Sequence, residues 1–481
     1  MRDLLSINQK RQLHLLEYLS NTKLIPQKVL LKELAYNKKT LLSDIIAINA
    51  VISPLFIQNQ PYQGISLSIP ANYNFDYIYS RYLSENIEFA ILESIFFDET
   101  YSLSTLAEYF YISSSTLRRI LSNINKNLST FSIEISLQPL ALIGDEEQIY
   151  LLMTNLLYEK YAPPNLPFNS LQIECLEQLI LTVSSKTWVS LTFSDFNRIK
   201  IWLLIIIIRI KNGHYPTVYK QLSEQIESSV LTNSVLTSSF YSNFQIPLTK
   251  QNLAYMFQFL MIQDYATDLS SLSLLSTTHA SVKYKLDIIE QTLEKIANEY
   301  NLAIKNKQQV ILKIYNKSLV VQAETFILNN RNKHFVDAIT AHNSTFLTIL
   351  TEEFDKLYPQ RSMKEYEMYA LAYCLTTNWP QLSLKLQSSQ KKLQAGLFFY
   401  TDVAHAHFIK EELSAHFNTK LQFTIMTELS LSDFKKNASN FDIVITNIYG
   451  LEIENVHVVC FPNVPSIKEY KILDELIGAI E

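Results

Sequence analysis

An apolar stripe at helical spacing runs through LSTLAEYFYISSSTLRRILSNINKNL, residues 103–128. In its second half, apolar residues recur three and four positions apart, which places them on one side of a helix. A shorter helix precedes it, and Ser113–Ser115 offer N-cap residues between the two. The inward positions are Leu103, Leu106, Ala107 and Phe110 in the first helix, and Leu117, Ile120, Leu121, Ile124 and Leu128 in the second.

The opposite side of the second helix is polar and basic, with Arg118, Arg119, Ser122, Asn123 and Lys126. Such side chains bond phosphates and base edges. The pattern therefore predicts a helix-turn-helix whose second helix is free to enter a major groove. A pair of helices that forms an ordinary structural corner stays the alternative. The turn departs from the usual pattern, because it holds tyrosine (residue 111) where glycine is common.

A second copy of the pattern lies 76 positions earlier, in LLKELAYNKKTLLSDIIAINAVI, residues 30–52. One position departs, since Asp44 stands where the later copy has Ile120. Strand-like residues around a turn follow each copy, as expected of a wing. A repeated winged unit favours DNA binding over a generic core. The aligned pairs include Leu30 with Leu106, Leu34 with Phe110, Thr40 with Thr116, Leu41 with Leu117, Ile45 with Leu121, Ile48 with Ile124, Asn49 with Asn125 and Ile52 with Leu128.

Length and composition indicate a globular protein of several domains. The chain has 481 residues, of which 48% are hydrophobic, and such a length predicts about three to five domains. The first residues are polar and charged, unlike a secretory signal. The longest apolar run, IWLLIIII (201–208), is far short of the roughly 20 residues that span a bilayer, so we expect a buried helix. Three scattered cysteines fit a reducing cytoplasm better than a disulfide framework.

Glycine is scarce, and this excludes most nucleotide-dependent enzymes. The six glycines are nowhere closer together than 28 positions, whereas phosphate-binding loops and dinucleotide fingerprints need several within about eight residues. No G-x-S-x-G elbow occurs either. His405, His407 and His416 lie near one another in sequence, but no cysteine pair or His-Glu spacing supports a closed metal site. We expect no catalytic residue, metal or cofactor.

Charge divides unevenly between the two winged units. The net charge is −5, but residues 1–60 hold eight Lys/Arg against four Asp/Glu, and residues 61–150 hold four against eleven. Because phosphate contacts drive affinity for DNA, the first unit is the better electrostatic candidate, and the second depends on a local basic patch. The predicted DNA-binding residues are Lys38, Lys39, Thr40, Ser115, Thr116, Arg118, Arg119, Asn123 and Lys126.

The rest of the chain divides into a helical middle and an alternating tail. From about residue 146 to 386 the periodicity is almost wholly helical, and the stretch 270–283 divides it into two bundles of similar size. From about residue 391, strands alternate with helical segments, which predicts a small, mostly parallel sheet covered by helices. The predicted strands are GLFFYTDV (396–403), KLQFTIMTEL (420–429), FDIVITNI (441–448) and VHVVCFP (456–462).

This arrangement resembles the Mga/AtxA family of bacterial virulence regulators, with the MafR-like global regulators nearest. The resemblance implies a mainly α, multidomain fold. Its parts are two winged helix-turn-helix units, two helical phosphotransferase-system regulation domains (PRDs), and an α/β tail like enzyme IIB. It also implies a cytoplasmic regulator that binds promoter DNA and forms a dimer through the tail. The expected further partners are phosphotransferase-system proteins, and no membrane partner is expected. The expected domains cover residues 1–75, 76–147, 148–272, 273–389 and 390–481.

The resemblance further implies regulation by histidine phosphorylation, which adds charge and shifts domain packing. In the first bundle the matching residue is His214, in IIIIRIKNGHYP. The competing interpretation is that Asn212-Gly213 ends a helix whose dipole the histidine complements. In the second bundle His342 and His334 are candidates, against ordinary helix-face histidines. Family members often have Leu-His-Asn early in that bundle, where this chain has Ile314-Tyr315-Asn316.

The tail departs from a working enzyme IIB. Such an enzyme carries a phosphate-accepting cysteine just after its first strand, where this chain has Tyr400-Thr401-Asp402. Cys460 belongs to a later strand, and we expect it to be packed. The tail is therefore predicted to serve in interaction or dimerisation rather than in phosphate transfer.

Two rival functions stay open at this stage. PRDs also occur in RNA-binding antiterminators, but RNA readers of that group begin with a small β-domain, whereas this N-terminus is helical and winged. A scaffold that does not bind DNA is the other rival, and the acidic second unit favours it.

Overall fold

The structure is a computed structural model in which the chain forms two compact units. One consists of Met1–Leu275 with Leu319–Arg331, and the other of Ser276–Ser318 with Asn332–Glu481. His342, a candidate phosphorylation site, lies outside the described residues. Within those residues, no helix is long and apolar enough to span a bilayer. The described residues are 1–20, 24–60, 64–162, 165–186, 192–216, 221–321, 326–341, 343–388, 392–418, 420–428 and 430–480.

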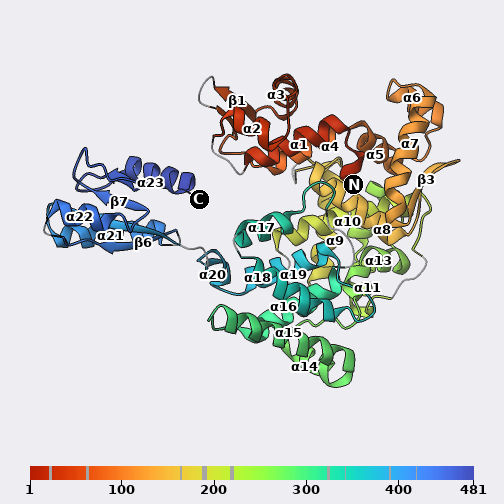
Figure 1. Ribbon diagram of the computed structural model, residues 1–481. Coiled ribbons are helices and arrows are strands. Elements are labelled where there is room, and N and C mark those ends of the chain that lie inside the picture. Colours follow the sequence, from red (N-terminus) through yellow and green to blue (C-terminus); the bar gives the residue numbers. More distant parts are fainter. Residues whose placement is uncertain are drawn as a thin grey trace. The chain divides into compact units, whose positions relative to one another are not determined.

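Two winged helix-turn-helix units open the first compact unit, as predicted. In each, a short helix, a turn and a longer helix precede an antiparallel hairpin. Figure 1 shows the later helix pair and its wing strand β3 side by side. The first has α1 (Ile7–Ser20), α2 (Gln27–Glu33), α3 (Lys38–Ile52), β1 (Phe56–Gln60) and β2 (Gly64–Ser68). The second has α4 (Asp76–Glu85), α5 (Ile87–Phe97), α6 (Leu103–Tyr109), α7 (Ser114–Leu128), β3 (Ile133–Leu137) and β4 (Leu140–Gly144).

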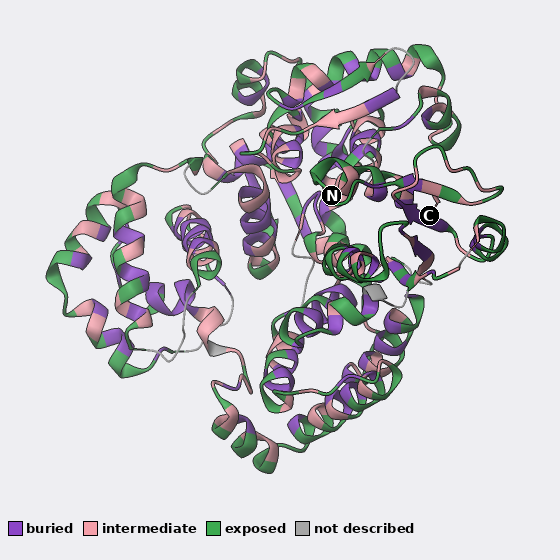
Figure 2. Cartoon of the chain, turned by 90° about the vertical axis from the view of Figure 1, so that its left-hand side faces the viewer, coloured by how far each residue is buried: buried purple, intermediate pink, exposed green. Residues whose placement is uncertain are grey.

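A helical bundle follows, organised around its most apolar helix. The run predicted to be a buried helix lies in α10, where Ile205 and Ile206 are fully buried. This helix packs against α8, α9 and α13, and Figure 2 shows buried residues along one side of helices and exposed residues along the other. The helices are α8 (Glu146–Lys160), α9 (Ser170–Ser184), α10 (Phe193–Lys211), α11 (Glu224–Leu231), α12 (Ser234–Phe244), α13 (Lys250–Met256) and α14 (Leu269–Thr278).

Further helices continue to residue 388. The stretch 270–283, predicted to divide the helical region, is itself helical and contains the border between the compact units. Tyr315, which stands where family members often have histidine, is fully buried in α16. The helices are α15 (Ala280–Glu299), α16 (Lys307–Val320), α17 (Arg331–Thr340), α18 (Ser344–Phe354), α19 (Glu365–Asn378) and α20 (Leu382–Ser388). Short 3-10 helices cover Arg2–Leu4, Ser129–Phe131, Gln258–Met261 and Asp355–Leu357.

The C-terminal part is a parallel four-stranded sheet with helices, which confirms the predicted α/β tail. The strand order is β6-β5-β7-β8, and each neighbouring pair is parallel. The side chains of Ala395, Leu397, Ile443 and Ile445 form its core with those of the helices. The elements are β5 (Leu393–Phe398), α21 (Val403–Phe417), β6 (Leu421–Ile425), α22 (Leu431–Ala438), β7 (Ile443–Thr446), β8 (His457–Cys460) and α23 (Ile467–Ile480).

The strand bounds of the tail and the burial of its cysteine were predicted wrongly. The first predicted strand, residues 396–403, is observed as β5 from Leu393 to Phe398, and Asp402 instead caps α21 by accepting a hydrogen bond from the His405 amide at 2.6 Å. Cys460 is exposed rather than packed. Alternate residues of a strand face opposite sides, and at this edge of the sheet Val459 takes the buried side.

A short segment after α16 is anchored deep in the first compact unit. The carboxylate of Glu159, on α8, accepts hydrogen bonds from three successive backbone amides, those of Ile327, Leu328 and Asn329, at 2.6, 2.8 and 3.2 Å. The side chains of Ile327 and Leu328 are buried in the core of that unit. Burial raises the pKa of Glu159, while the three amide donors act in the opposite direction.

The same segment is held from the N-terminal side. Arg2 donates two hydrogen bonds to the Leu328 carbonyl, at 2.9 and 2.6 Å. Asp76, at the start of α4, accepts a hydrogen bond from the side-chain amide of Asn329 at 2.7 Å and forms an ion pair with Arg331 at 2.9 Å. The segment thus ties both winged units to the first bundle.

We predict that Glu159→Ala lowers the free energy of unfolding by about 3 kcal/mol, because three buried amides lose their acceptor. Urea unfolding of the full-length protein measures the loss, and trypsin cleavage after Arg331 should become faster. Glu147→Ala is the control, since Glu147 is exposed on the same helix. Its removal should change neither the free energy of unfolding nor the rate of trypsin cleavage. Equal stability of the two variants would contradict the anchoring role.

Candidate nucleic-acid interface

The turns of the two helix pairs share one backbone conformation. Ala35 and Tyr111, 76 positions apart, are both left-handed, with φ of 52° and 54°. The tyrosine is 96% exposed, so the left-handed backbone at this position places no bulky side chain in the core. Backbone hydrogen bonds that typically end a helix hold this turn, including one from the Ile112 amide to the Ala107 carbonyl at 3.0 Å. Left-handed geometry, not glycine, is therefore what the turn requires.

The longer helix of each pair begins with a side-chain cap. Asn37 accepts a hydrogen bond from the Thr40 amide at 2.8 Å, and Ser113 accepts one from the Thr116 amide at 3.1 Å. The Ser113 hydroxyl also bonds Ser115 at 2.8 Å. Ser113 is thus the N-cap among the three serines proposed for it. The predicted contact residues Thr40, Ser115 and Thr116 consequently lie in the first turn, where the helix dipole favours a negatively charged phosphate.

An asparagine in each longer helix fastens the wing. Asn125 donates to the Ile135 carbonyl at 3.1 Å and accepts from the Ile135 amide at 2.7 Å. Asn49 makes the same two bonds to Ile57, at 3.1 and 2.7 Å. Sequence reasoning aligned these asparagines but gave them no role. Their recurrence in both copies of the repeat was the available signal.

The one departure between the copies is a buried ion pair. The carboxylate of Asp44, on the inner side of α3, accepts from Arg11 of α1 at 2.6 and 2.7 Å and from Gln12 at 3.2 Å. The hydrogen bonding to Asp44 raises the pKa of the Arg11 guanidinium. Tyr36 donates to the Arg11 carbonyl at 2.8 Å, and burial raises the pKa of Tyr36 to about 12. Asp44 is therefore a satisfied polar residue of the core rather than a break in the helix pattern.

The outward side of α7 gathers the predicted basic residues. Arg118, Arg119, Asn123 and Lys126 are all exposed and follow one another at helical spacing. The apolar side of the same helix is buried against the core. The structure thus brings these four residues onto one accessible face, which has the donors needed for phosphates and purine edges.

The outward side of α3 is different. Lys38 and Lys39 are exposed in its first turn, as predicted, but the turns that follow expose Leu42 and Ile46, to 36% and 73%. Sequence reasoning missed these apolar positions because its comparison of the two copies did not include Leu42 and Ile46.

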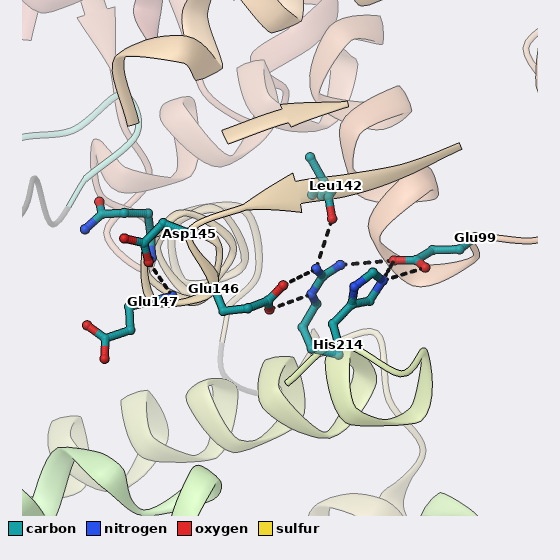
Figure 3. Close-up of polar contacts among 8 residues, drawn as sticks. Glu99, Leu142, Asp145, Glu146, Glu147 and His214 are labelled. Carbon is teal, nitrogen blue, oxygen red and sulfur yellow. Dashed lines mark hydrogen bonds and ion pairs between the residues drawn. The ribbon is translucent and has the colours of Figure 1, made fainter. Parts of the chain in front are cut away.

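A buried arginine joins the second winged unit to the first bundle. Arg209, on α10, has a fully buried guanidinium that bonds Glu146 at 3.0 and 2.5 Å, Glu99 at 3.0 Å and the Leu142 carbonyl at 2.9 Å. Figure 3 shows Glu99, Glu146 and Leu142 around this part of the site, each with a dashed line that marks a polar contact. Two carboxylates and a carbonyl thus compensate the desolvated charge.

His214 belongs to the same cluster. Asn212 and Gly213 end α10, and the His214 amide donates back to the Arg209 carbonyl at 2.9 Å, which confirms the predicted helix end. Its ring points toward Glu99 (Figure 3), with Nε2 at 2.8 and 2.9 Å from the two carboxylate oxygens. Glu99 lies between α5 and α6, so the histidine contacts the segment that leads into the second helix-turn-helix.

Family models match two long stretches of the chain. One, described as the Mga helix-turn-helix domain, matches residues 71–157, which contain α6, α7 and their wing. The other, described as the M protein trans-acting positive regulator (MGA) PRD domain, matches residues 173–353.

The chain belongs to the Mga-type family of transcriptional regulators.

Curated relatives agree with this family assignment. The chain is 26% identical over 99% of both chains to a Streptococcus pneumoniae serotype 4 protein that is named provisionally as a trans-acting regulator. It is 20% identical to the capsule synthesis positive regulator AcpB of Bacillus anthracis, over 96% of both chains. It is also 20% identical to the anthrax toxin expression trans-acting positive regulator of the same organism, over 86% of both.

Three other histidines of this Mga-type regulator, all within the described residues, have ordinary surroundings. His334 is exposed on α17. His405 bonds Thr401 at 2.9 Å and the Asn463 carbonyl at 2.5 Å, and His416 bonds the Glu412 carbonyl at 3.1 Å. Within the described part of the chain, no group of three or more metal-binding side chains comes together.

We predict that Arg11→Ala lowers the free energy of unfolding by about 3 to 5 kcal/mol, because it leaves the Asp44 carboxylate buried without its cation. Asp44→Ile, which installs the residue type of Ile120, should cost less than about 1.5 kcal/mol, since Arg11 is partly exposed and can return to water. Urea unfolding of the full-length variants measures both. Equal losses would show that the ion pair itself, rather than burial of an uncompensated charge, sets the cost.

Proposed function

We propose that this Mga-type regulator binds double-stranded promoter DNA, with α7 as the helix that reads the major groove. The observation that carries the proposal is the exposed face with Arg118, Arg119, Asn123 and Lys126 on the second helix of a winged helix-turn-helix. Arginine bonds guanine bidentately, asparagine does the same with adenine, and lysine neutralises phosphates. Asn125 supports the reading helix by fastening the wing beside it.

The first winged unit contributes phosphate contacts in the same proposal. Lys38, Lys39 and Thr40 occupy the exposed or half-exposed first turn of α3, where the helix dipole also attracts an anion. Ser115 and Thr116 occupy the corresponding turn of α7. Since residues 61–150 carry a net charge of −7, the basic first unit supplies attraction that the second unit lacks.

We predict that Arg118→Ala/Arg119→Ala and Lys38→Ala/Lys39→Ala both weaken binding to an A·T-rich promoter duplex. If a variant removes phosphate contacts, the slope of log affinity against log salt should fall by about 0.9 per lost contact. Fluorescence anisotropy with the full-length protein between about 50 and 200 mM salt measures this slope.

The charge-matched control is Lys435→Ala/Lys436→Ala, which removes two exposed lysines of α22 and should leave affinity almost unchanged. If all three double variants lose affinity equally, the effect is one of overall charge. If neither N-terminal variant differs from wild type, the DNA-binding proposal fails, and the helix pairs are structural corners.

Phosphorylation of His214 by phosphotransferase-system proteins is the proposed means of control. A phosphate adds a charge of about −1.5 to −2, and in this protein it would be placed beside the Glu99 carboxylate. Repulsion would separate the two and disturb the segment that leads into α6. We also propose a homodimer through the C-terminal α/β domain, which suits the two-fold symmetry common among DNA readers.

We predict that His214→Asp, which imitates the added negative charge, weakens DNA binding several-fold, because two carboxylates then face each other. His214→Gln is the matched control and should bind nearly as wild type, since its amide can still donate to Glu99. Adding Glu99→Gln to His214→Asp should restore part of the affinity, because it removes the repulsion while Glu146 still compensates Arg209. Anisotropy with the same duplex measures all three, and a double variant no better than His214→Asp would contradict the mechanism.

A further inference from the structure

The outward sides of α3 and α7 occupy corresponding places in the repeat but differ in chemistry. Both helices have 15 residues and begin 76 positions apart. Where α7 presents charged and polar groups, α3 presents mostly small or apolar ones. The corresponding residues are Arg118 and Leu42, Arg119 and Ser43, Ser122 and Ile46, Asn123 and Ala47, and Lys126 and Ala50.

The apolar residues on this side do not belong to the protein core. The inner side of α3 is already filled by Leu41, Ile45 and Ile48, which are buried. Leu42 and Ile46 stand one turn apart on the outside, and Ile46 is 73% exposed. Burying them against a partner would release the water that now covers them.

The charges around this stripe point to a polyanion as that partner. Lys38 and Lys39 at the start of α3 are exposed, and so are Lys28 and Lys32 on α2. Among the described residues of the two helices, the acidic ones are Glu33, which is exposed, and Asp44. The latter is buried and compensated by Arg11, so the exposed charged residues of these two helices are four lysines and one glutamate.

We propose that α3 lies in a major groove and reads the C5-methyl groups of thymine with Leu42 and Ile46. This inference rests on the proposed DNA binding and adds its base preference. The thymine methyl is the apolar group that distinguishes an A·T pair in the major groove, and apolar side chains contact it there. The lysines at the helix start hold the flanking phosphates, while α7 reads polar base edges elsewhere on the site.

The test compares two duplexes that differ only in methyl groups. One is an A·T-rich promoter fragment, and the other has the same sequence with every thymine replaced by deoxyuridine, which keeps the base-pair hydrogen bonds. Wild-type full-length protein should bind the deoxyuridine duplex more weakly, by about fourfold for each methyl group contacted. Leu42→Ser/Ile46→Ser should bind both duplexes with nearly the same affinity.

A control variant separates methyl reading from changes in DNA shape. Lys126→Ala, on the other winged unit, should lose affinity for both duplexes and keep the wild-type ratio between them. If Leu42→Ser/Ile46→Ser keeps the wild-type ratio as well, the preference comes from DNA shape, and the inference is overturned.

The remaining outcomes distinguish this inference from the function on which it rests. If wild type binds both duplexes equally well, methyl reading is overturned and DNA binding stands. If wild type binds neither, both proposals fall. If Leu42→Ser/Ile46→Ser leaves the duplex ratio unchanged but alters the mass of the DNA-free protein in sedimentation, the stripe contacts a second copy of this chain instead.

Discussion

The interior charge of Arg209 is the interaction on which the arrangement of the first compact unit depends. A guanidinium without water needs several acceptors at once, and here they come from three places. Glu99 precedes the second helix-turn-helix, the Leu142 carbonyl belongs to its wing, and Glu146 opens the first bundle. The cation can be satisfied only when these elements are assembled. His214 also contacts Glu99. The proposed phosphorylation site therefore shares this carboxylate with Arg209, in the segment that leads into the proposed DNA-reading helix pair.

The two winged units show which features of the repeat are mechanical and which are free to differ. Left-handed turns at Ala35 and Tyr111 recur in register, and so do the capped helix starts and the asparagine clamps at Asn49 and Asn125. These features fix how helix, turn and wing meet. The outward residues make none of these contacts, and they differ most between the two copies. The same winged fold can therefore present a polar face on α7 and an apolar face on α3. This difference suits the proposal that the two helices contact different groups of the same DNA.

Much of the fold was predictable because local periodicity is a direct record of burial. The stripe of α7, the buried run of α10 and the alternating tail all follow from which positions must avoid water. The helical, winged N-terminus also differs from the β-domain expected of an RNA reader. Predictions failed where a local pattern does not determine the outcome. Cys460 is in a strand as expected, but its exposure depends on which side of an edge strand it takes, and Asp402 begins the next helix instead of extending the strand.

The sequence by itself determined where most helices and strands lie and which side of the amphipathic helices is buried, because these features depend on neighbours a few positions away. It also placed Arg118, Arg119, Asn123 and Lys126 on one outward side. Only the tertiary structure decided the partners. Glu99 lies 110 positions from Arg209 and 115 from His214, and Asp44 finds Arg11 33 positions away. The sequence pattern around a charged residue does not identify its counter-ion, because the two come together only when distant elements pack and exclude water.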